Sequence, residues 1–406
     1  MSSAGCLRPT DSAECSHRRV SGTSCSAAGR SDPAGVVHVR DFTAARAVLR
    51  SRHSVQAGFG VEVVSAIPLL GNLPLVYLDG EPHRGQRRWT ARLFAPAVVQ
   101  ASYRPLMERQ AAALADELVR RKRLDVAELS LRMAVQVGCQ VVGLTNSVLR
   151  RRLPRRIDRL VGVEVAARGW RPGQLVGLLR MHLPALAFFL LDVLPAIAAR
   201  RRRRATHDDM LAQLRSQGRS WREMFTECLL FSVAAIVTTR EFICLALWHL
   251  LDRPALADRY RLAGQSERLA ILHEILRLEP VVGHLYRRAT ADIPLDPAAP
   301  DRMVPRGALV IIHLHDVNAD PATVGPDPLQ IRPARPLTGA AVPADVTSLG
   351  DGHHRCPGGP LALQETDILL RRLLALPRLR ILTPPRLDHN HTADSYQLRN
   401  FTLTLD

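Results

Sequence analysis

The chain has 406 residues, of which 47% are hydrophobic and only 4% aromatic, so a large core has to be built mainly from aliphatic side chains. Its 55 Lys and Arg residues against 38 Asp and Glu residues give a net charge of +17, but no nucleic-acid-binding motif accompanies that charge, and we expect no nucleic-acid partner. The seven cysteines, an odd number in a long chain, argue against a disulfide scaffold. Three of them lie in apolar surroundings and are expected to be buried: Cys139, Cys228 and Cys244.

The first half of the chain is predicted to be a flexible tail followed mainly by helices. Residues 1–34 are rich in Ser, Gly and Arg, which is typical of a disordered tail, and residues 35–406 are expected to form a single domain. A short strand is predicted over 36–39, and Asp41 is a suitable N-cap for a helix from Phe42 to Arg50. The segments that follow are, in chain order, a loop-rich stretch over 52–78, helices over 81–144 with breaks near Pro96 and Pro105, and further helices and loops over 147–204.

The second half begins with a long buried helix. Ser220 opens this helix, which runs to about Leu251 and is apolar on nearly all sides over 231–239. The segments after it are, in chain order, helices at 255–263 and 266–278, strands at 283–288 and 308–313, an irregular stretch at 318–350, a helix at 360–375, and β-hairpins over 380–406. The predicted fold class is therefore mainly α with a minor β component.

The most apolar stretch, Leu183–Ile197, is interrupted by Pro184 and Pro195, contains Asp192, and is short for a bilayer. The first 34 residues hold no apolar segment long enough for a signal peptide. We therefore expect no membrane span and a cytoplasmic, reducing location.

One cysteine stands in a glycine-rich turn directly before a predicted helix. The stretch from Leu349 to Gly359 reads L-G-D-G-H-H-R-C-P-G-G, and its cysteine is Cys356. Glycine permits tight turns and the close approach of a flat ligand. A helix that starts near Pro360 places free N–H groups close to the sulfur, which favours the thiolate over the thiol.

This segment resembles the haem-binding loop of the cytochrome P450 family, written F-G-x-G-x-H-x-C-x-G. The positions that match in register are Gly350, Gly352, His354, Cys356 and Gly358. Leu349 stands where the family has phenylalanine. The resemblance covers about residues 36–406 and implies the cytochrome P450 fold, a triangular helical prism with small β-sheets. It also implies haem b as cofactor, with Cys356 as the thiolate ligand of the iron, a ligation that favours O–O cleavage.

Two further segments resemble motifs of the same family. Glu274-Ile-Leu-Arg277 matches its E-x-x-R helix, which places a carboxylate and a guanidinium on one helical face, and Arg335 matches the arginine that joins this structural pair. Residues 79–88, D-G-E-P-H-R-G-Q-R-R, resemble its D-P-P-x-H-x-x-x-R-R helix start. The residues that the resemblance implies as ligands of the haem propionates are His83, Arg87, Arg287 and His354.

The long buried helix matches the family pattern [AG]-G-x-[DE]-T-[TS] only in part, since it reads Ala234-Ala235-Ile236-Val237-Thr238-Thr239. The resemblance implies that Thr238, with Thr239 beside it, is catalytic and assists proton delivery to bound dioxygen, and that Ala234 contacts the haem. Val237 replaces the acid that relays those protons. Three routes stay open: supply by Glu241, delivery by the substrate, or a reaction that needs fewer relayed protons.

The resemblance implies an oxygenase that uses O2 to hydroxylate or epoxidise a small organic metabolite. The Arg- and Ala-rich, nearly Lys-free composition suggests a GC-rich bacterial genome and a role in secondary metabolism. One alternative is oxidative C–C or C–N coupling or ring formation on the same scaffold. Another, of a different class, is a haem-binding or sensor protein without turnover.

No flavin or iron–sulfur module is recognisable, so the resemblance implies a separate ferredoxin and ferredoxin reductase. We expect an acidic ferredoxin to dock near the Cys356 loop, where Arg84, Arg88 and Arg355 lie by motif position. The residues expected to line the substrate pocket are Ala235, Val237, Val281, Val282, His284 and Phe401.

Overall fold

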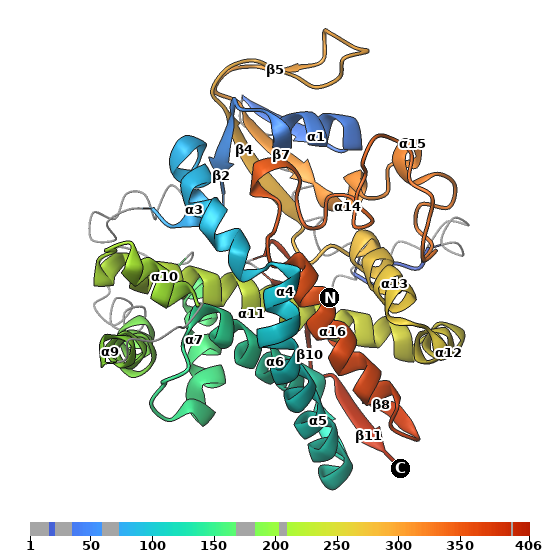
Figure 1. Cartoon of the computed structure of the whole chain (residues 1–406). Helices are drawn as coiled ribbons and strands as arrows, with labels where there is room; N and C mark the ends of the chain where they lie inside the picture. Colours follow the sequence, from blue (N-terminus) through green and yellow to red (C-terminus); the bar gives the residue numbers. More distant parts are fainter. Residues whose placement is uncertain (1–15, 21–34, 59–72, 168–182, 203–208, 391–392) are drawn as a thin grey trace, which may run out of the picture.

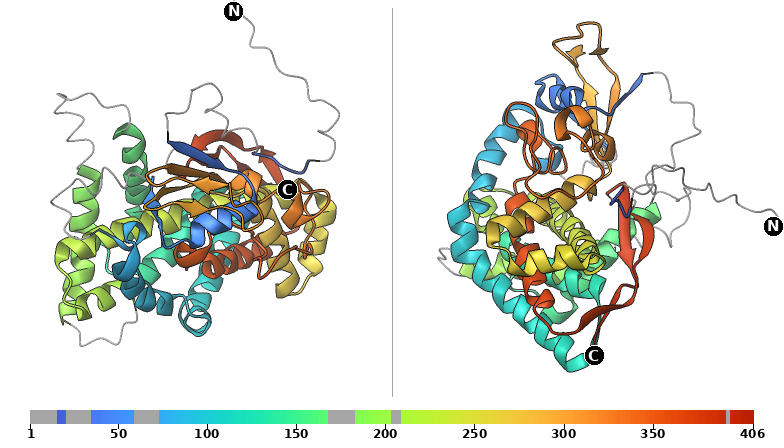
Figure 2. Two further views of the ribbon diagram at one scale, coloured as in Figure 1. Left: turned by 90° about the horizontal axis from the view of Figure 1, so that it is seen from above. Right: turned by 90° about the vertical axis from the view of Figure 1, so that its right-hand side faces the viewer.

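The computed structural model describes residues 16–20, 35–58, 73–167, 183–202, 209–390 and 393–406. A four-stranded sheet lies at one end of the molecule, at the top of Figure 1, and helices with smaller sheets form the remainder. The right-hand view of Figure 2 shows the same separation from the side. The predicted fold class, mainly α with a minor β component, is therefore confirmed.

The four-stranded sheet brings together segments that are far apart in the sequence. Its order is β1 (Val36–Val39), β7 (Leu309–His313), β4 (His284–Ala289) and β2 (Ser54–Ala57), with β1 parallel to β7 and the other pairs antiparallel. The helix α1 (Phe42–Arg50) connects β1 to β2, and its N-cap Asp41 accepts a hydrogen bond from the backbone N–H of Ala44. The predicted strand and helix at this end of the chain are both confirmed.

The long helix α11 (Trp221–Leu251) forms the centre of the helical part. It begins with a capping box, in which the Ser220 hydroxyl accepts from the N–H of Glu223 and the Glu223 carboxylate accepts from the N–H of Ser220. Four elements complete the core around it: α6 (Val126–Val142), α16 (Gly359–Leu374), α13 (Gln265–Leu278) and α5 (Arg104–Arg121). Both ends of α11 lie where the sequence predicts them.

Shorter helices flank this core. In chain order they are η4 (Leu75–Tyr77), α3 (Gly80–Leu93), α4 (Pro96–Val98), η5 (Val99–Tyr103), η6 (Arg150–Arg152), α7 (Leu153–Ala167), η7 (Phe189–Val193), α9 (Leu194–Arg202), α10 (Met210–Ser216), α12 (Pro254–Leu262), α14 (Leu314–Val317) and α15 (Pro321–Val324). Pro96 opens α4 after a non-helical residue, so the break predicted there is confirmed. The break predicted near Pro105 is wrong, because η5 continues directly into α5 with helical backbone angles at Tyr103 and Arg104.

The remaining strands form three small sheets. They are β3 (Arg123–Asp125), β8 (Leu379–Thr383) and β11 (Thr402–Leu405) in one sheet, β9 (Arg386–Asn390) and β10 (Ser395–Arg399) in a hairpin, and β5 (Ile293–Pro294) with β6 (Met303–Val304). The sequence pattern does not predict β2 or β3. Both are short, and both form only because a distant strand, β4 or β11, lies beside them.

Residues 16–20 pack onto the domain, so the predicted disordered tail is wrong at these five positions. Val20 is 1% exposed within the core, and its N–H donates to Glu279 Oε2 at 3.1 Å. The Arg18 guanidinium donates to the carbonyl groups of Leu278 and His315. A buried carboxylate and free carbonyl groups thus order a segment whose composition indicates disorder. The rest of the predicted tail lies outside the described residues.

Among the residues that the structure describes, two helical segments have the length and apolar composition of a membrane span: Leu183–Arg200 and α11. Of the apolar window in α11, 67% is buried inside the protein, as expected for the central helix of a globular core. Only 33% of the Leu183–Arg200 window is buried. The prediction that no membrane span is present relied on the apolar stretch Leu183–Ile197 being short. The helical segment is longer than that stretch, because it continues to Arg202.

Candidate functional site

The loop that carries Cys356 has a backbone shape that depends on glycine. It runs from Leu349 to the start of α16, and the N–H of Cys356 donates to the Leu349 carbonyl at 2.7 Å. Gly350 and Gly352 have φ values of +74° and +65°, a region that other residues rarely adopt. A Cβ on Gly352 would also collide with the backbone carbonyl of Leu49. These two glycines let the loop fold back over α1 and present the cysteine.

The Cys356 side chain is exposed, in contrast to the buried Cys139, Cys228 and Cys244. The pKa of its thiol is raised by the protein atoms around it, while the backbone N–H groups of Gly358 and Gly359 and the Arg87 guanidinium act in the opposite direction. Those donors stabilise a negative charge on the sulfur. A metal bound at the sulfur would remove the proton outright, so the loop offers an accessible thiolate ligand.

Leu349 packs against the first residue of α16, since its side chain fills the space that a Cβ on Gly359 would occupy. It also lies against the main core, partly buried. Leucine therefore fills an apolar position in the loop where the family pattern has phenylalanine.

A cluster of cationic and imidazole side chains gathers at the N-terminus of α3, at β4 and at the Cys356 loop. Arg287 is only 3% exposed, and among the described residues its side chain donates only to the carbonyl of the adjacent Tyr286, at 2.7 Å. Burial lowers the pKa of Arg287 to about 10, and Asp79 acts in the opposite direction. Arg87 donates to the carbonyl of Arg355. A buried guanidinium with so few partners suits an anionic ligand.

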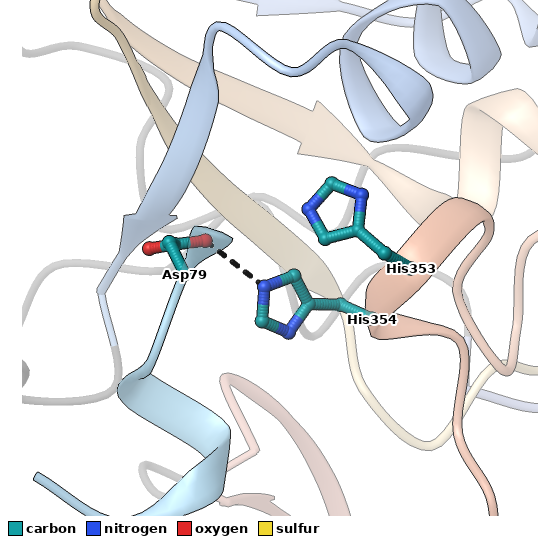
Figure 3. A group of neighbouring side chains, drawn as sticks. All are labelled: Asp79, His353 and His354. Atoms are coloured by element: carbon teal, nitrogen blue, oxygen red, sulfur yellow. Dashed lines mark hydrogen bonds and ion pairs between the residues drawn. The ribbon is translucent and has the colours of Figure 1, made fainter. Parts of the chain in front are cut away.

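Three imidazoles stand beside Asp79, the N-cap residue of α3. Asp79 Oδ1 accepts from His354 Nε2 at 3.0 Å (Figure 3). The ring of His83 lies 4.1 Å from that of His354 and 5.8 Å from that of His353, measured between centroids. His83 Nδ1 is buried and has no hydrogen-bond partner among the residues described. Burial and the neighbouring charges lower the pKa of His83 to about 4.

Asp79, His353 and His354 offer three ligand atoms that all lie within 4.8 Å of one another, a geometry that could hold a metal ion. Arg87 and Arg287 lie in the same cluster and disfavour a further cation there. The cluster instead fits the carboxylates of a haem, because it has more hydrogen-bond donors than acceptors. Among these donors are the unpartnered His83 nitrogen and the buried Arg287 guanidinium. The structure thus brings together all four residues expected at the propionates: His83, Arg87, Arg287 and His354.

One face of α11 is open, although the helix lies in the core. Ala234 and Ala235 are exposed, and Thr238 on the same face donates its hydroxyl to the Ala234 carbonyl at 2.7 Å. Val237, at 3% exposure, and Thr239, at 6%, are turned into the protein. The helical repeat places these two at the two flanks of the open face, where both are covered by the protein, so the expectation that Val237 lines the pocket is wrong, and Thr239 does not reach the open face.

Glu241, one of three routes considered for proton supply, is not free for that role. It is fully buried and binds Arg240 Nε at 2.9 Å, Arg399 Nη1 at 2.8 Å and the N–H of Leu398 at 3.0 Å. The Glu241 carboxylate binds groups on β10 and so connects α11 to that strand. Because the side chain is fully buried in these contacts, it cannot carry protons from solvent to Thr238.

The other residues expected in the substrate pocket divide into two groups. Phe401, at 0% exposure, and Val281, at 5%, are core residues, which corrects their predicted place in the pocket. Val282 is partly buried against the core cluster of the four-stranded sheet. His284 is held between Asp394 Oδ2, 2.8 Å from its Nδ1, and His313 Nδ1, 3.2 Å from its Nε2. The hydrogen bonds of His284 on β4 therefore go to His313 on β7 and to Asp394 in the loop before β10.

The Glu274–Arg277–Arg335 network joins α13 to the irregular segment that precedes the cysteine loop. Arg277 Nε lies 2.7 Å from Glu274 Oε2, and Arg335 Nε lies 3.0 Å from Glu274 Oε1. Arg277 also donates to the carbonyl groups of Asn318 and Pro328. All three side chains are buried, so the predicted pairing is observed, and it holds the segment that positions Cys356.

The sequence reasoning missed two acids and one imidazole near this site. Glu227 on α11 accepts hydrogen bonds from Gln86 and from the N–H of Leu75, and burial raises its pKa to about 7. Asp394 binds His284, and His353 completes the imidazole cluster. The only sequence signal for His353 is the histidine doublet within the cysteine loop. No sequence signal marks Glu227 or Asp394, because their hydrogen-bond partners come from distant elements.

The cytochrome P450 family model matches residues 269–391. The chain is 24% identical over 368 residues to cytochrome P450 85A1 of Brachypodium distachyon, covering 79% of this chain and 74% of that protein. It is 26% identical over 328 residues to the beta-dihydromenaquinone-9 omega-hydroxylase of Mycobacterium bovis, covering 78% of this chain and 62% of that protein. The crystal structure of P450BioI with an acyl carrier protein ligated to hexadec-9Z-enoic acid superposes with a TM-score of 0.72 at 21% identity, covering 91% of this chain and 92% of that one.

The fold, the glycine-shaped cysteine loop and the anion-binding cluster define a haem-thiolate protein. The chain belongs to the cytochrome P450 family and is a cytochrome P450 monooxygenase.

Proposed function

We propose that this cytochrome P450 uses O2 to hydroxylate or epoxidise a small apolar metabolite in bacterial secondary metabolism, and that it works in the cytoplasm. The observation that carries the proposal is an exposed cysteine, Cys356, beside a cluster of cations with few partners. When bound, haem b supplies the oxidising chemistry at its iron. Cys356 would bind that iron, and His83, Arg87, Arg287 and His354 would bind its propionates.

The substrate would lie against the open face of α11. Ala234 and Ala235 present small apolar side chains there, and Thr238 presents the only hydroxyl of the 234–239 stretch that shares this face. In this proposal Thr238 holds and passes a proton at its Oγ1. Two relatives support an apolar substrate class, since their names refer to a menaquinone and to a hexadecenoic acid.

The absorption spectrum of the dithionite-reduced protein with carbon monoxide tests the haem-thiolate site. We expect a strongly red-shifted Soret band that Cys356→Ala abolishes and that the matched control Cys139→Ala retains, because Cys139 is buried away from the site. An unshifted band in the unmodified protein would contradict thiolate ligation and favour a haem-binding protein without turnover.

Oxidative C–C or C–N coupling is a second candidate, and one observation favours it. The acid position beside Thr238 holds the buried Val237, and the next acid, Glu241, is locked in ion pairs. A coupling reaction needs fewer protons relayed through this helix. Val237→Asp should change the product ratio or the fraction of oxygen released as hydrogen peroxide. An unchanged product and unchanged coupling would show that this position does not direct proton flow.

We also propose that electrons come from a separate acidic ferredoxin and its reductase. Of the three arginines expected at the docking face, Arg84 pairs with Glu81 at 2.6 Å and Arg355 pairs with Asp345 at 2.7 Å. Arg88 is exposed and has no acidic partner among the residues described. Arg88→Glu should therefore slow reduction by ferredoxin most at low salt. A rate independent of both the substitution and the salt would refute this docking site.

A further inference from the structure

A row of leucines on the helical segment 183–202 faces outward. Leu183, Leu186, Leu190 and Leu194 are exposed by 56%, 51%, 47% and 43%. Their spacing of three or four residues places them along one face of the helix. The window Leu183–Arg200 has a mean hydropathy of 1.7, typical of a membrane span, yet only 33% of it is buried. The helix thus keeps a membrane-like apolar face that the described protein does not cover.

Apolar residues from two other segments extend this row. The N–H of Val148 donates to the Leu191 carbonyl at 2.8 Å, which ties the loop before α7 to the helix, and both Val148 and Leu149 are exposed. The Trp221 ring lies 5.3 Å from that of Phe189. We name as the apolar surface the seven side chains Val148, Leu149, Leu183, Leu186, Leu190, Leu194 and Trp221. They are seven of the twelve exposed large hydrophobic residues in the described part of the chain, so the exposure is concentrated here.

Positive charge borders the apolar surface. Arg150–Arg152 follow Leu149 directly, Arg155 comes one turn later, and all four are exposed with no acidic partner among the residues that the structure describes. The acid within the helical segment, Asp192, is fully buried and bound by Arg156 at 2.5 Å. The nearby Asp158 is held by Arg240 at 2.6 Å. The surface therefore combines exposed leucines and a tryptophan with a cationic border.

We propose that the apolar surface docks on an anionic lipid bilayer, with the helical segment lying parallel to the membrane plane. The leucines would enter the acyl boundary, Trp221 would lie at the interface, and the arginines would contact lipid phosphates. Charge complementarity selects this partner over a second copy of the chain. A symmetric contact through the same face would place the arginines of both copies in one interface. The inference concerns attachment and holds whichever oxidation the haem site performs.

Co-sedimentation of the haem-loaded full chain with lipid vesicles tests the proposal. We expect binding to vesicles of phosphatidylcholine mixed with phosphatidylglycerol, and much weaker binding to phosphatidylcholine alone. The double variant Leu186→Asp/Leu190→Asp should weaken partitioning by about 10- to 100-fold or more, because these two half-exposed leucines together bury about as much apolar surface as one fully buried side chain, which contributes on that scale. Arg151→Glu/Arg152→Glu should weaken binding mainly to the anionic vesicles.

Leu262→Asp is the matched control. Leu262 is 88% exposed at the end of α12, which lies on the opposite side of the molecule from α9 in Figure 1, and its substitution should leave vesicle binding unchanged. All variants should keep the spectrum of the reduced carbon monoxide complex, which reports the folded haem site.

Three results would overturn the proposal. They are absence of vesicle binding by the unmodified protein, equal binding to neutral and anionic vesicles, and binding that the leucine double variant does not affect. A self-association that the double variant abolishes, without vesicle binding, would instead assign the surface to a second copy. These readouts do not depend on catalysis, so a failure here is distinct from a failure of the proposed oxygenase function.

Discussion

Replacing Glu365 with glutamine should remove a pH-dependent loss of stability. Glu365 lies on α16, nine residues after Cys356, and is 3% exposed. Its Oε1 has no hydrogen-bond partner among the atoms described. Burial alone raises the pKa of this carboxyl to about 8. Near neutral pH the folded protein therefore holds Glu365 in its protonated form, whereas the unfolded chain ionises it.

The sign and size of the effect follow from proton linkage. The unfolded pKa is 4.5, and below it both states hold the proton, so ionisation adds no cost. As the pH rises toward 8, the unfolded state gains from ionisation and the folded state does not, so the unfolding free energy falls by about 1.4 kcal/mol per pH unit. The loss reaches about 3 kcal/mol at neutral pH and at most about 5 kcal/mol once the pH exceeds the folded pKa.

The assay is the midpoint of urea unfolding, followed by far-ultraviolet circular dichroism between pH 5 and 9. Glu365→Gln should become progressively more stable than the unmodified protein as the pH rises, because glutamine cannot ionise. The control Glu267→Gln removes an exposed ion pair with Arg259 and should change the unfolding free energy by less than about 1 kcal/mol at every pH. Parallel pH profiles for the unmodified protein and Glu365→Gln would refute the reasoning.

Two further substitutions test how the cysteine loop is held. Glu274→Gln leaves the two buried arginines of its network without a counter-charge. The unfolding free energy should therefore fall by about 3–5 kcal/mol in the same urea assay. An unchanged urea midpoint would mean that the network does not stabilise the fold. Gly352→Ala forces a positive φ on alanine and a collision with the Leu49 carbonyl, so the melting temperature and the haem content should both fall. Gly85→Ala, in the open surroundings of α3, should instead stabilise by up to about 1 kcal/mol, and equal effects of the two alanines would contradict the steric argument.

Local signals in the sequence were sufficient for much of the fold. Ser220 with Glu223 marks the start of α11, and Asp41 marks the start of α1, because a cap involves only residues within one turn. The cysteine loop was equally local, since Gly350 and Gly352 adopt the positive φ angles that only glycine accepts readily. The clustering of His83, Arg87, Arg287 and His354 followed from the family resemblance and not from any local pattern.

The tertiary structure decided which side of each element is covered. It turned Val237 into the interior while Ala234 and Ala235 stayed open, and it placed Phe401 in the core. It paired β2 and β3 with strands far away in the chain, and it ordered residues 16–20 through Glu279. It also left the leucines of the helical segment 183–202 uncovered. Caps and glycine turns are settled within a few residues, whereas burial depends on which distant surfaces meet, and that information is spread over the whole chain.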